Sequence, residues 1–196
     1  MEESVAKVGL PRILDDRAAA IQERLTNHTI KVAQSLEREG LVEIQLAISG
    51  IGNNAAIRFG EIKGIQNVIN QKEGTLGLRM KHQVLQSQKR NFKRESIVIG
   101  TDLPSLSKLD LLEALAALEK NEMVLGPASD GGYWLIGFSK KIVTPLVTWP
   151  FSGIPWGTKE VLSTTIKRGL SKGMQIKLLR ELNDLDNIED LSPWLT

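Results

Sequence analysis

Asp102 stands where a carboxylate commonly does chemistry. It follows the apolar run SIVIG at residues 96–100, which predicts a short strand that ends in a glycine. A carboxylate at the carboxyl end of a strand, with a glycine that permits close approach, suits a hard cation that bridges phosphates. The alternative is a turn in which Asp102 binds its own backbone before the next helix. Asp102 is therefore a candidate metal ligand.

A second candidate lies in the segment GPASDGGYW, between two apolar runs. Asp130, Gly131 and Gly132 form a strong turn signal, and a plain β-hairpin is the favoured interpretation. The functional alternative is a loop whose glycines let a ligand approach the backbone. Asp130 would then act as a base or accept a hydroxyl group, and Tyr133 follows the two glycines directly.

Acidic residues recur near the end of the chain, in NDLDNIEDL. Asp186 and Glu189 have the spacing of a capping box, which is sufficient to explain both. Asp184 and Asp186 would nevertheless project from a strand end toward the expected position of Asp102. Carboxylates that converge are costly unless a cation neutralises them, so Asp186 is a candidate second metal ligand.

The fourth segment of interest is the aromatic loop WPFSGIPWGT, which leads into a predicted helix. Trp156 could stack on a sugar or a base, and a helix that starts at Gly157 and Thr158 could face an anion. Aromatic-proline loops also pack simply over hydrophobic cores. Both interpretations stay open for these three residues.

Composition limits the chemistry. The chain has no cysteine and only two histidines, so a bound metal would be held by oxygen, as Mg²⁺ or Mn²⁺ is. The net charge of +2 gives no reason to expect nucleic acid as a partner. No apolar run has the length of a membrane span, and the acidic start MEES lacks a signal peptide's hydrophobic region. We expect a cytoplasmic protein.

Hydrophobic periodicity predicts an α/β protein in which helices pack on both sides of a mostly parallel sheet, in three layers. Ligands of such sheets bind at the carboxyl ends of the strands. No linker divides the sequence, so residues 1–196 are expected to form a single domain. Helices are predicted over residues 15–39, 53–60, 76–92, 105–120, 159–168 and 187–195, and strands over residues 41–49, 66–69, 96–100, 122–125, 133–138 and 175–179.

Five ordered blocks resemble the DUF2064 family of glycosyltransferase-like proteins: QKEGTLGLRM, VIGTDLPSLS, LGPASDGGYWLIGF, GIPWGTKEVL and LNDLDNIEDL. The resemblance runs from about Arg17 to Leu191. That family belongs to the glycosyltransferase-A, or nucleotide-diphospho-sugar transferase, superfamily. The resemblance implies a metal-dependent glycosyltransferase with Asp102 and Asp186 on a divalent cation, a nucleotide-sugar donor and an unidentified acceptor. It places Asp130, Gly131 and Gly132 on the acceptor or sugar side.

One departure from the family pattern concerns the start of the chain. Family members usually begin with a strand and a basic, glycine-containing loop that cradles the nucleotide, and residues 6–10 are too short to replace them. Either the start codon is assigned late, or the protein has lost that loop. Two alternatives to glycosyl transfer therefore stay open: nucleotidyl transfer on the same fold, and a catalytically inactive binding protein. A missing strand would also leave a sheet edge that favours self-association.

Overall fold

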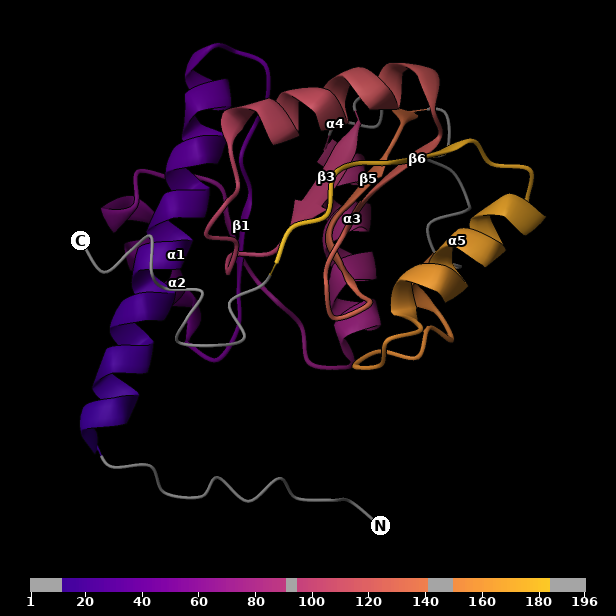
Figure 1. Cartoon of the computed structure of the whole chain (residues 1–196). Coiled ribbons are helices and arrows are strands. Elements are labelled where there is room, and N and C mark those ends of the chain that lie inside the picture. Colours follow the sequence, from indigo (N-terminus) through magenta and orange to yellow (C-terminus); the bar gives the residue numbers. More distant parts are fainter. Residues whose placement is uncertain (1–11, 91–94, 141–149, 184–196) are drawn as a thin grey trace.

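The computed structural model describes residues 12–90, 95–140 and 150–183, which alternate between helices and strands (Figure 1). The first element is a long helix, α1 (Arg12–Arg38), close to the predicted range. Gly40, just after its end, has a φ of 71°, the left-handed conformation that glycine adopts readily at the end of a helix. The predicted helix over residues 187–195 lies outside the described residues.

A small two-stranded sheet follows. Strand β1 (Leu46–Ile48) pairs in parallel with β2 (Val68–Asn70), and α2 (Asn53–Ile62) connects them. β1 is shorter than the predicted strand, because residues 41–45 are not paired in the described part of the chain. Every residue of the two strands is only partly buried.

The larger sheet has four strands in the order β3-β5-β4-β6. β5 is antiparallel to both of its neighbours, whereas β4 and β6 are parallel. The elements are α3 (Leu76–Arg90), β3 (Ser96–Ile99), α4 (Lys108–Lys120), β4 (Met123–Pro127), β5 (Tyr133–Phe138), α5 (Val161–Ser171) and β6 (Ile176–Leu178).

The predicted mostly parallel sheet therefore needs correction. Three of the four strands run in one direction, but two of the three pairings are antiparallel. The reason is the tight turn between β4 and β5, since a parallel neighbour would need a long crossover connection. The apolar strand β3 also pairs antiparallel with β5. Its apolar character reflects contact with core residues on both faces.

Two hydrophobic clusters hold this sheet. One joins α1 and α4 to the sheet through residues such as Leu118, Val124 and Leu135. The other joins α3 and α5 to it through residues such as Leu125 and Phe138. Val124 and Leu125 are neighbours in β4 and fall in different clusters, as the alternating side chains of a strand require. Figure 1 shows α4 above the strands and α3 behind them.

Two predicted helix starts differ from the structure. The helix predicted from residue 105 begins at Lys108, with Ser107 as its N-cap and Asp110 in its first turn. The predicted start at Gly157 and Thr158 is wrong, because α5 begins at Val161 after its N-cap Glu160. Thr158 instead donates its hydroxyl to the Pro155 carbonyl at 2.8 Å. None of the helices in the described part of the chain combines the length and hydropathy that a membrane crossing requires.

Candidate functional site

The candidate segments from the sequence lie together at one end of the four-stranded sheet, where β3 and β4 stop and β5 starts. The carboxyl end of β3 lies beside the start of β5, where the Gly100 amide donates to the Trp134 carbonyl at 3.1 Å. On the other side, Leu182 forms a parallel bridge with Ala128 and donates its amide to Pro127. The loop after β3, the β4–β5 turn and the chain that leads to residue 184 therefore leave the sheet at a common edge.

Asp102 is exposed in the loop after β3. A Cβ at Gly100 would lie 2.9 Å from Asp102 Oδ1, so the carboxylate folds back toward Gly100. Within the described part of the chain, no residue donates a hydrogen bond to this carboxylate. The predicted alternative, in which Asp102 binds its own backbone, is therefore not observed among the described residues. Its oxygens are available to an external ligand.

Asp130 occupies the turn of the β4–β5 hairpin, and the predicted hairpin is confirmed. Its Oδ1 accepts the Gly132 amide at 2.7 Å, as expected of an aspartate that stabilises a turn. The side chain stays exposed. Structural bonding and a role toward a ligand are compatible here, because one carboxylate oxygen accepts the turn bond and a second remains.

The hairpin turn packs against the start of α5. A Cβ on Gly131 would lie 2.5 Å from the Lys159 carbonyl oxygen, and the Leu162 amide donates to the Gly131 carbonyl at 3.0 Å. Gly131 also has a φ of 89°, so glycine is required for two reasons. The structure thus joins two blocks that the sequence treated separately: residues 130–133 and residues 156–158.

Trp156 is the second link between these blocks. Its ring meets Tyr133 edge-on, with the centroids 6.1 Å apart, and its indole nitrogen would be 2.5 Å from a Cβ on Gly77 of α3. Burial raises the pKa of Tyr133, which excludes it as a base near neutral pH. Both rings pack on the cluster behind the sheet. Trp156 thus packs on the core, whereas the neighbouring Gly157 and Thr158 are exposed.

The predicted second metal ligand, Asp186, lies outside the described residues, as does Asp184. Among residues 12–90, 95–140 and 150–183, no three acidic or histidine side chains form a group that could hold a metal ion. From the described part of the site, Asp102 therefore supplies a carboxylate that would need other oxygen ligands to complete a cation site.

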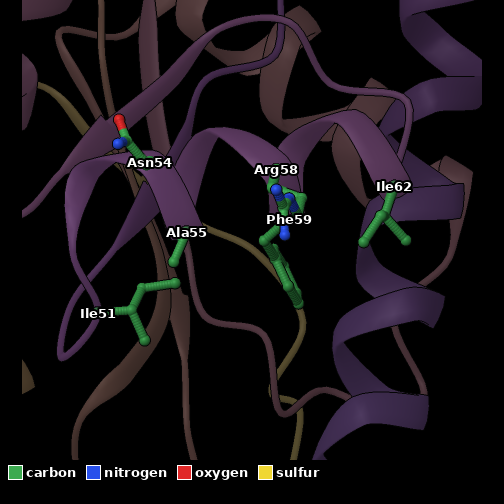
Figure 2. A pocket seen from close by; sticks show the side chains of 6 residues that line it. All are labelled: Ile51, Asn54, Ala55, Arg58, Phe59 and Ile62. Atoms are coloured by element: carbon green, nitrogen blue, oxygen red, sulfur yellow. The ribbon is translucent and has the colours of Figure 1, made fainter.

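Two hollows lie away from this edge, and neither is lined by a predicted site residue. Figure 2 shows the first, about 360 Å³, where Ile51, Ala55, Phe59 and Ile62 project along α2. The second, about 230 Å³, is a groove between the two sheets. Residues 41–45 and Asn67 line one side of the groove, and β3 and α4 line the other through Ile97, Ile99, Leu111 and Leu115.

Sequence reasoning missed Arg180, which follows β6. Its guanidinium contacts Asp110 and the Ser105 carbonyl, so it connects the end of β6 to the loop of Asp102. The contact spans 70 residues, and no local pattern announces it. The available signal was Asp110 itself, an acid in the first turn of a helix that has a serine cap.

Comparison with known proteins places the chain in a family. Residues 31–158 match the model of "Uncharacterized protein conserved in bacteria (DUF2064)". The fold is similar to the crystal structure of a "putative nucleotide-diphospho-sugar transferase" from Desulfovibrio desulfuricans G20, with a TM-score of 0.68 and 26% identity. That match covers 84% of this chain and 70% of the other. No curated protein matches the sequence. The chain belongs to the DUF2064 family, as its motifs predict.

Proposed function

We propose that this protein is a metal-dependent glycosyltransferase that uses a nucleotide-diphosphate sugar as donor. The observation that carries the proposal is the common sheet edge, where the exposed Asp102 and Asp130 lie beside the chain that leads to Asp186. The similarity to the Desulfovibrio protein supports the class of donor. On this basis the chain would adopt the three-layer glycosyltransferase-A arrangement.

Asp102 would bind Mg²⁺ or Mn²⁺, with Asp186 as a second ligand. The chemistry of the carboxylate fits the group: it is exposed, accepts no hydrogen bond from the described residues, and a hard cation prefers such oxygens. Diphosphate oxygens and water would complete the coordination. The cation would neutralise charge on the departing nucleoside diphosphate.

Asp130 would orient or deprotonate the hydroxyl group of the acceptor. Because its Oδ1 is fixed by the Gly132 amide, the position of the carboxylate is set before a ligand arrives. The acceptor oxygen would form a bond to the anomeric carbon as the bond from that carbon to the diphosphate breaks, and Asp130 would take the hydroxyl proton. Gly131, Gly132 and the exposed Gly157 and Thr158 would border the substrate, with Tyr133 and Trp156 packed behind them.

The groove between the two sheets bears on the first strand of the glycosyltransferase-A fold. β1 and β3 each have an edge with no strand partner in the described chain. The groove is lined by residues 41–45, which precede β1, and by Ile97 and Ile99 of β3, with polar as well as apolar side chains. We propose that this groove is the position of the first strand of that fold. If it stays empty, nucleotide affinity would be low, which is the basis of the inactive-binding-protein hypothesis.

The products of the reaction test the proposed function. The protein would be incubated with Mn²⁺ and a panel of nucleotide-diphosphate sugars, and nucleoside diphosphate and pyrophosphate would be measured separately. Release of nucleoside diphosphate supports glycosyl transfer. Release of pyrophosphate supports the nucleotidyltransferase alternative, and nucleotide binding without either product supports an inactive binding protein.

Substitutions of Asp102 and Asp130 should affect different steps of the reaction. Asp102→Asn is expected to weaken Mn²⁺-dependent nucleotide binding by about 100-fold or more, because an amide is a poor ligand for a hard cation. Asp130→Ala should lower kcat by about 100-fold with a smaller effect on donor binding, because the acceptor's proton moves in the transition state. Isothermal titration with Mn²⁺ and nucleotide, beside steady-state kinetics, separates the two. Unchanged binding in Asp102→Asn would rule it out as the metal ligand.

A further inference from the structure

Arg180, in the described segment that follows β6, donates three side-chain hydrogen bonds. Its Nε and Nη2 donate to the two oxygens of Asp110, the latter at 2.8 Å, so the ion pair is bidentate. Nη2 also donates to the Ser105 carbonyl at 2.9 Å. An arginine fork that meets both oxygens of a carboxylate fixes direction as well as distance. The contact therefore holds together the loop before α4, the start of α4 and the chain after β6.

Asp110 is the rigid half of this pair. Its side chain is only 5% exposed, whereas that of Arg180 is 50% exposed. The Ser107 amide and hydroxyl both donate to Asp110 Oδ2, each at 2.7 Å. A carboxylate held by three donors on one oxygen cannot move without losing bonds that water cannot fully replace at a buried position. Asp110 is thus a fixed anchor at the start of α4.

The loop that carries Asp102 ends on this anchor. Ser105 belongs to the loop, and Leu103 and Leu106 on either side of it are buried. His28 of α1 contacts the Leu106 carbonyl at 2.8 Å through Nε2. Each of these contacts fixes the far end of the loop, while Gly100 fixes its beginning on β5. Asp102 lies between the two fixed points.

Arg180 is itself tied to the sheet. The Trp134 indole nitrogen donates to the Arg180 carbonyl at 3.2 Å, and the neighbouring Leu179 amide donates to Leu125 at 2.9 Å. Two residues later, Leu182 is paired with the end of β4. The guanidinium therefore links the chain after β6 to the loop after β3.

We propose that Arg180 and Asp110 are positioning residues that hold the Asp102 loop in register with the chain after β6, and thereby set the affinity for the metal–nucleotide pair. The inference deepens the proposed function and rests on it. A carboxylate that must meet a cation together with ligands from another segment works only if both segments keep their relative position. The Arg180–Asp110 bond joins those two segments in the described structure.

The test uses Arg180→Gln, Arg180→Lys and Asp110→Asn in the whole protein, with Lys108→Gln as the matched control. Lys108 begins the same helix and forms an exposed ion pair with Glu39, without reaching the loop. Hydrogen exchange of residues 100–107 reports on the loop with no ligand present. Electron paramagnetic resonance measures the affinity for Mn²⁺, alone and with a mixture of ADP, CDP, GDP and UDP.

Arg180→Gln is expected to speed exchange in residues 100–107 by about tenfold and to weaken Mn²⁺–nucleotide binding by about tenfold. Arg180→Lys should restore part of both, because it keeps the charge but not the fork. Lys108→Gln should change neither. A double-mutant cycle with Asp110→Asn should show that the two effects are not additive.

Other outcomes would overturn the inference at separate points. If exchange and binding are both unchanged in Arg180→Gln, the pair does not hold the loop. If exchange rises but Mn²⁺–nucleotide binding is unchanged, the pair is structural only and has no positioning role. If the wild-type protein binds no Mn²⁺–nucleotide, the proposed function and the link to metal affinity both fail, while exchange still decides whether the loop is held.

Discussion

The two sheets of this protein differ in how completely they are covered. In the four-stranded sheet β4 is buried from Met123 to Gly126 and β5 from Trp134 to Phe138, between two hydrophobic clusters. In the small sheet every residue of β1 and β2 is only partly buried, and α2 exposes Ile57 and Ile62. The candidate site lies on the covered sheet. The packed support of the candidate site and the less completely covered surface thus occupy different regions.

This difference has a physical meaning for the site. Side chains that must hold a cation and a hydroxyl need a support that does not relax, and a close-packed sheet provides it. Apolar residues left half-covered, in contrast, indicate a surface that another segment or molecule covers. We therefore expect stability to depend chiefly on the larger sheet, and association to depend on the groove beside the smaller one.

The largest expected effect compares the two sheets directly. Phe138→Ala removes a ring that is 1% exposed and packs edge-on against Phe151, so we expect a loss of about 3–5 kcal/mol. Ile48→Ala in β1 should cost about 1–2 kcal/mol, because the site is partly buried and leaves a smaller cavity. Urea denaturation of both variants measures the difference. Equal losses would contradict the contrast between the sheets.

A smaller effect separates close packing from backbone strain at the hairpin. Gly131→Ala places a methyl group against the Lys159 backbone and also strains a φ of 89°, so we expect a loss of about 3 kcal/mol. Gly157→Ala is the control: its φ of 78° is equally strained, but no atom lies within 4 Å of the added methyl. It should cost about 1 kcal/mol.

The same hairpin should tie stability to function. Because Gly131 joins the Asp130 turn to α5, Gly131→Ala should lower turnover as well as the melting temperature. Gly157→Ala should lower the melting temperature less, because its added methyl group meets no atom within 4 Å. Thermal melts and kinetics on the same samples check both. If the two variants lose equal stability, the contact with Lys159 does not constrain the turn.

These examples show how far sequence reasoning reaches. Local chemistry was sufficient for the hairpin, because the signal DGG lies between two apolar runs. The mixture of helices and strands and the family also followed from the sequence. The order of the strands did not follow, since apolar β3 gives no sign that its partner is antiparallel.

The site itself was less predictable. The contact of Gly131 with Lys159 and that of Arg180 with Asp110 join residues far apart in the chain, and each depends on tertiary packing rather than on spacing. The predicted helix start at Gly157 and Thr158 is wrong, because the local pattern gives no sign that α5 begins only at Val161. Asp102, in contrast, is a candidate from its position after a strand, and its role stays a prediction.

The groove can also be compared with the exposed face of α2. Leu41 lines the groove and is 50% exposed, while Ile57 is 44% exposed on α2 and lines neither hollow. We expect the protein to self-associate through the groove, and Leu41→Asp to weaken that association by about tenfold, or about 1.4 kcal/mol. Ile57→Asp should leave it unchanged. Sedimentation across a range of protein concentrations measures both, and a wild-type protein that is monomeric throughout would contradict the expectation.

The smallest expected effect concerns ion pairs in the two regions at acid pH. Burial raises the pKa of Asp110, but the bonds from Arg180 and Ser107 outweigh it and hold that pKa below its ordinary value of 3.8. Since the folded-state pKa is the lower one, this pair stabilises the protein above pH 3.8, and the contribution is lost as the pH falls through the folded pKa. Asp110→Asn should therefore cost about 1 kcal/mol at neutral pH. The difference from wild type should shrink as the pH falls below about 4.

Glu23 provides the control for that pH dependence. Its hydrogen bond with Lys63, at 2.9 Å, also holds its pKa below the ordinary value, but the Glu23 side chain is 62% exposed, against 5% for Asp110. Solvent screens such a pair, so Glu23→Gln should change the melting temperature little at any pH. Melting temperatures of both variants between pH 7 and pH 3 make the comparison. If Glu23→Gln shows the same acid dependence as Asp110→Asn, burial does not distinguish the two pairs, and the Arg180–Asp110 bond holds its loop no more firmly than a surface contact would.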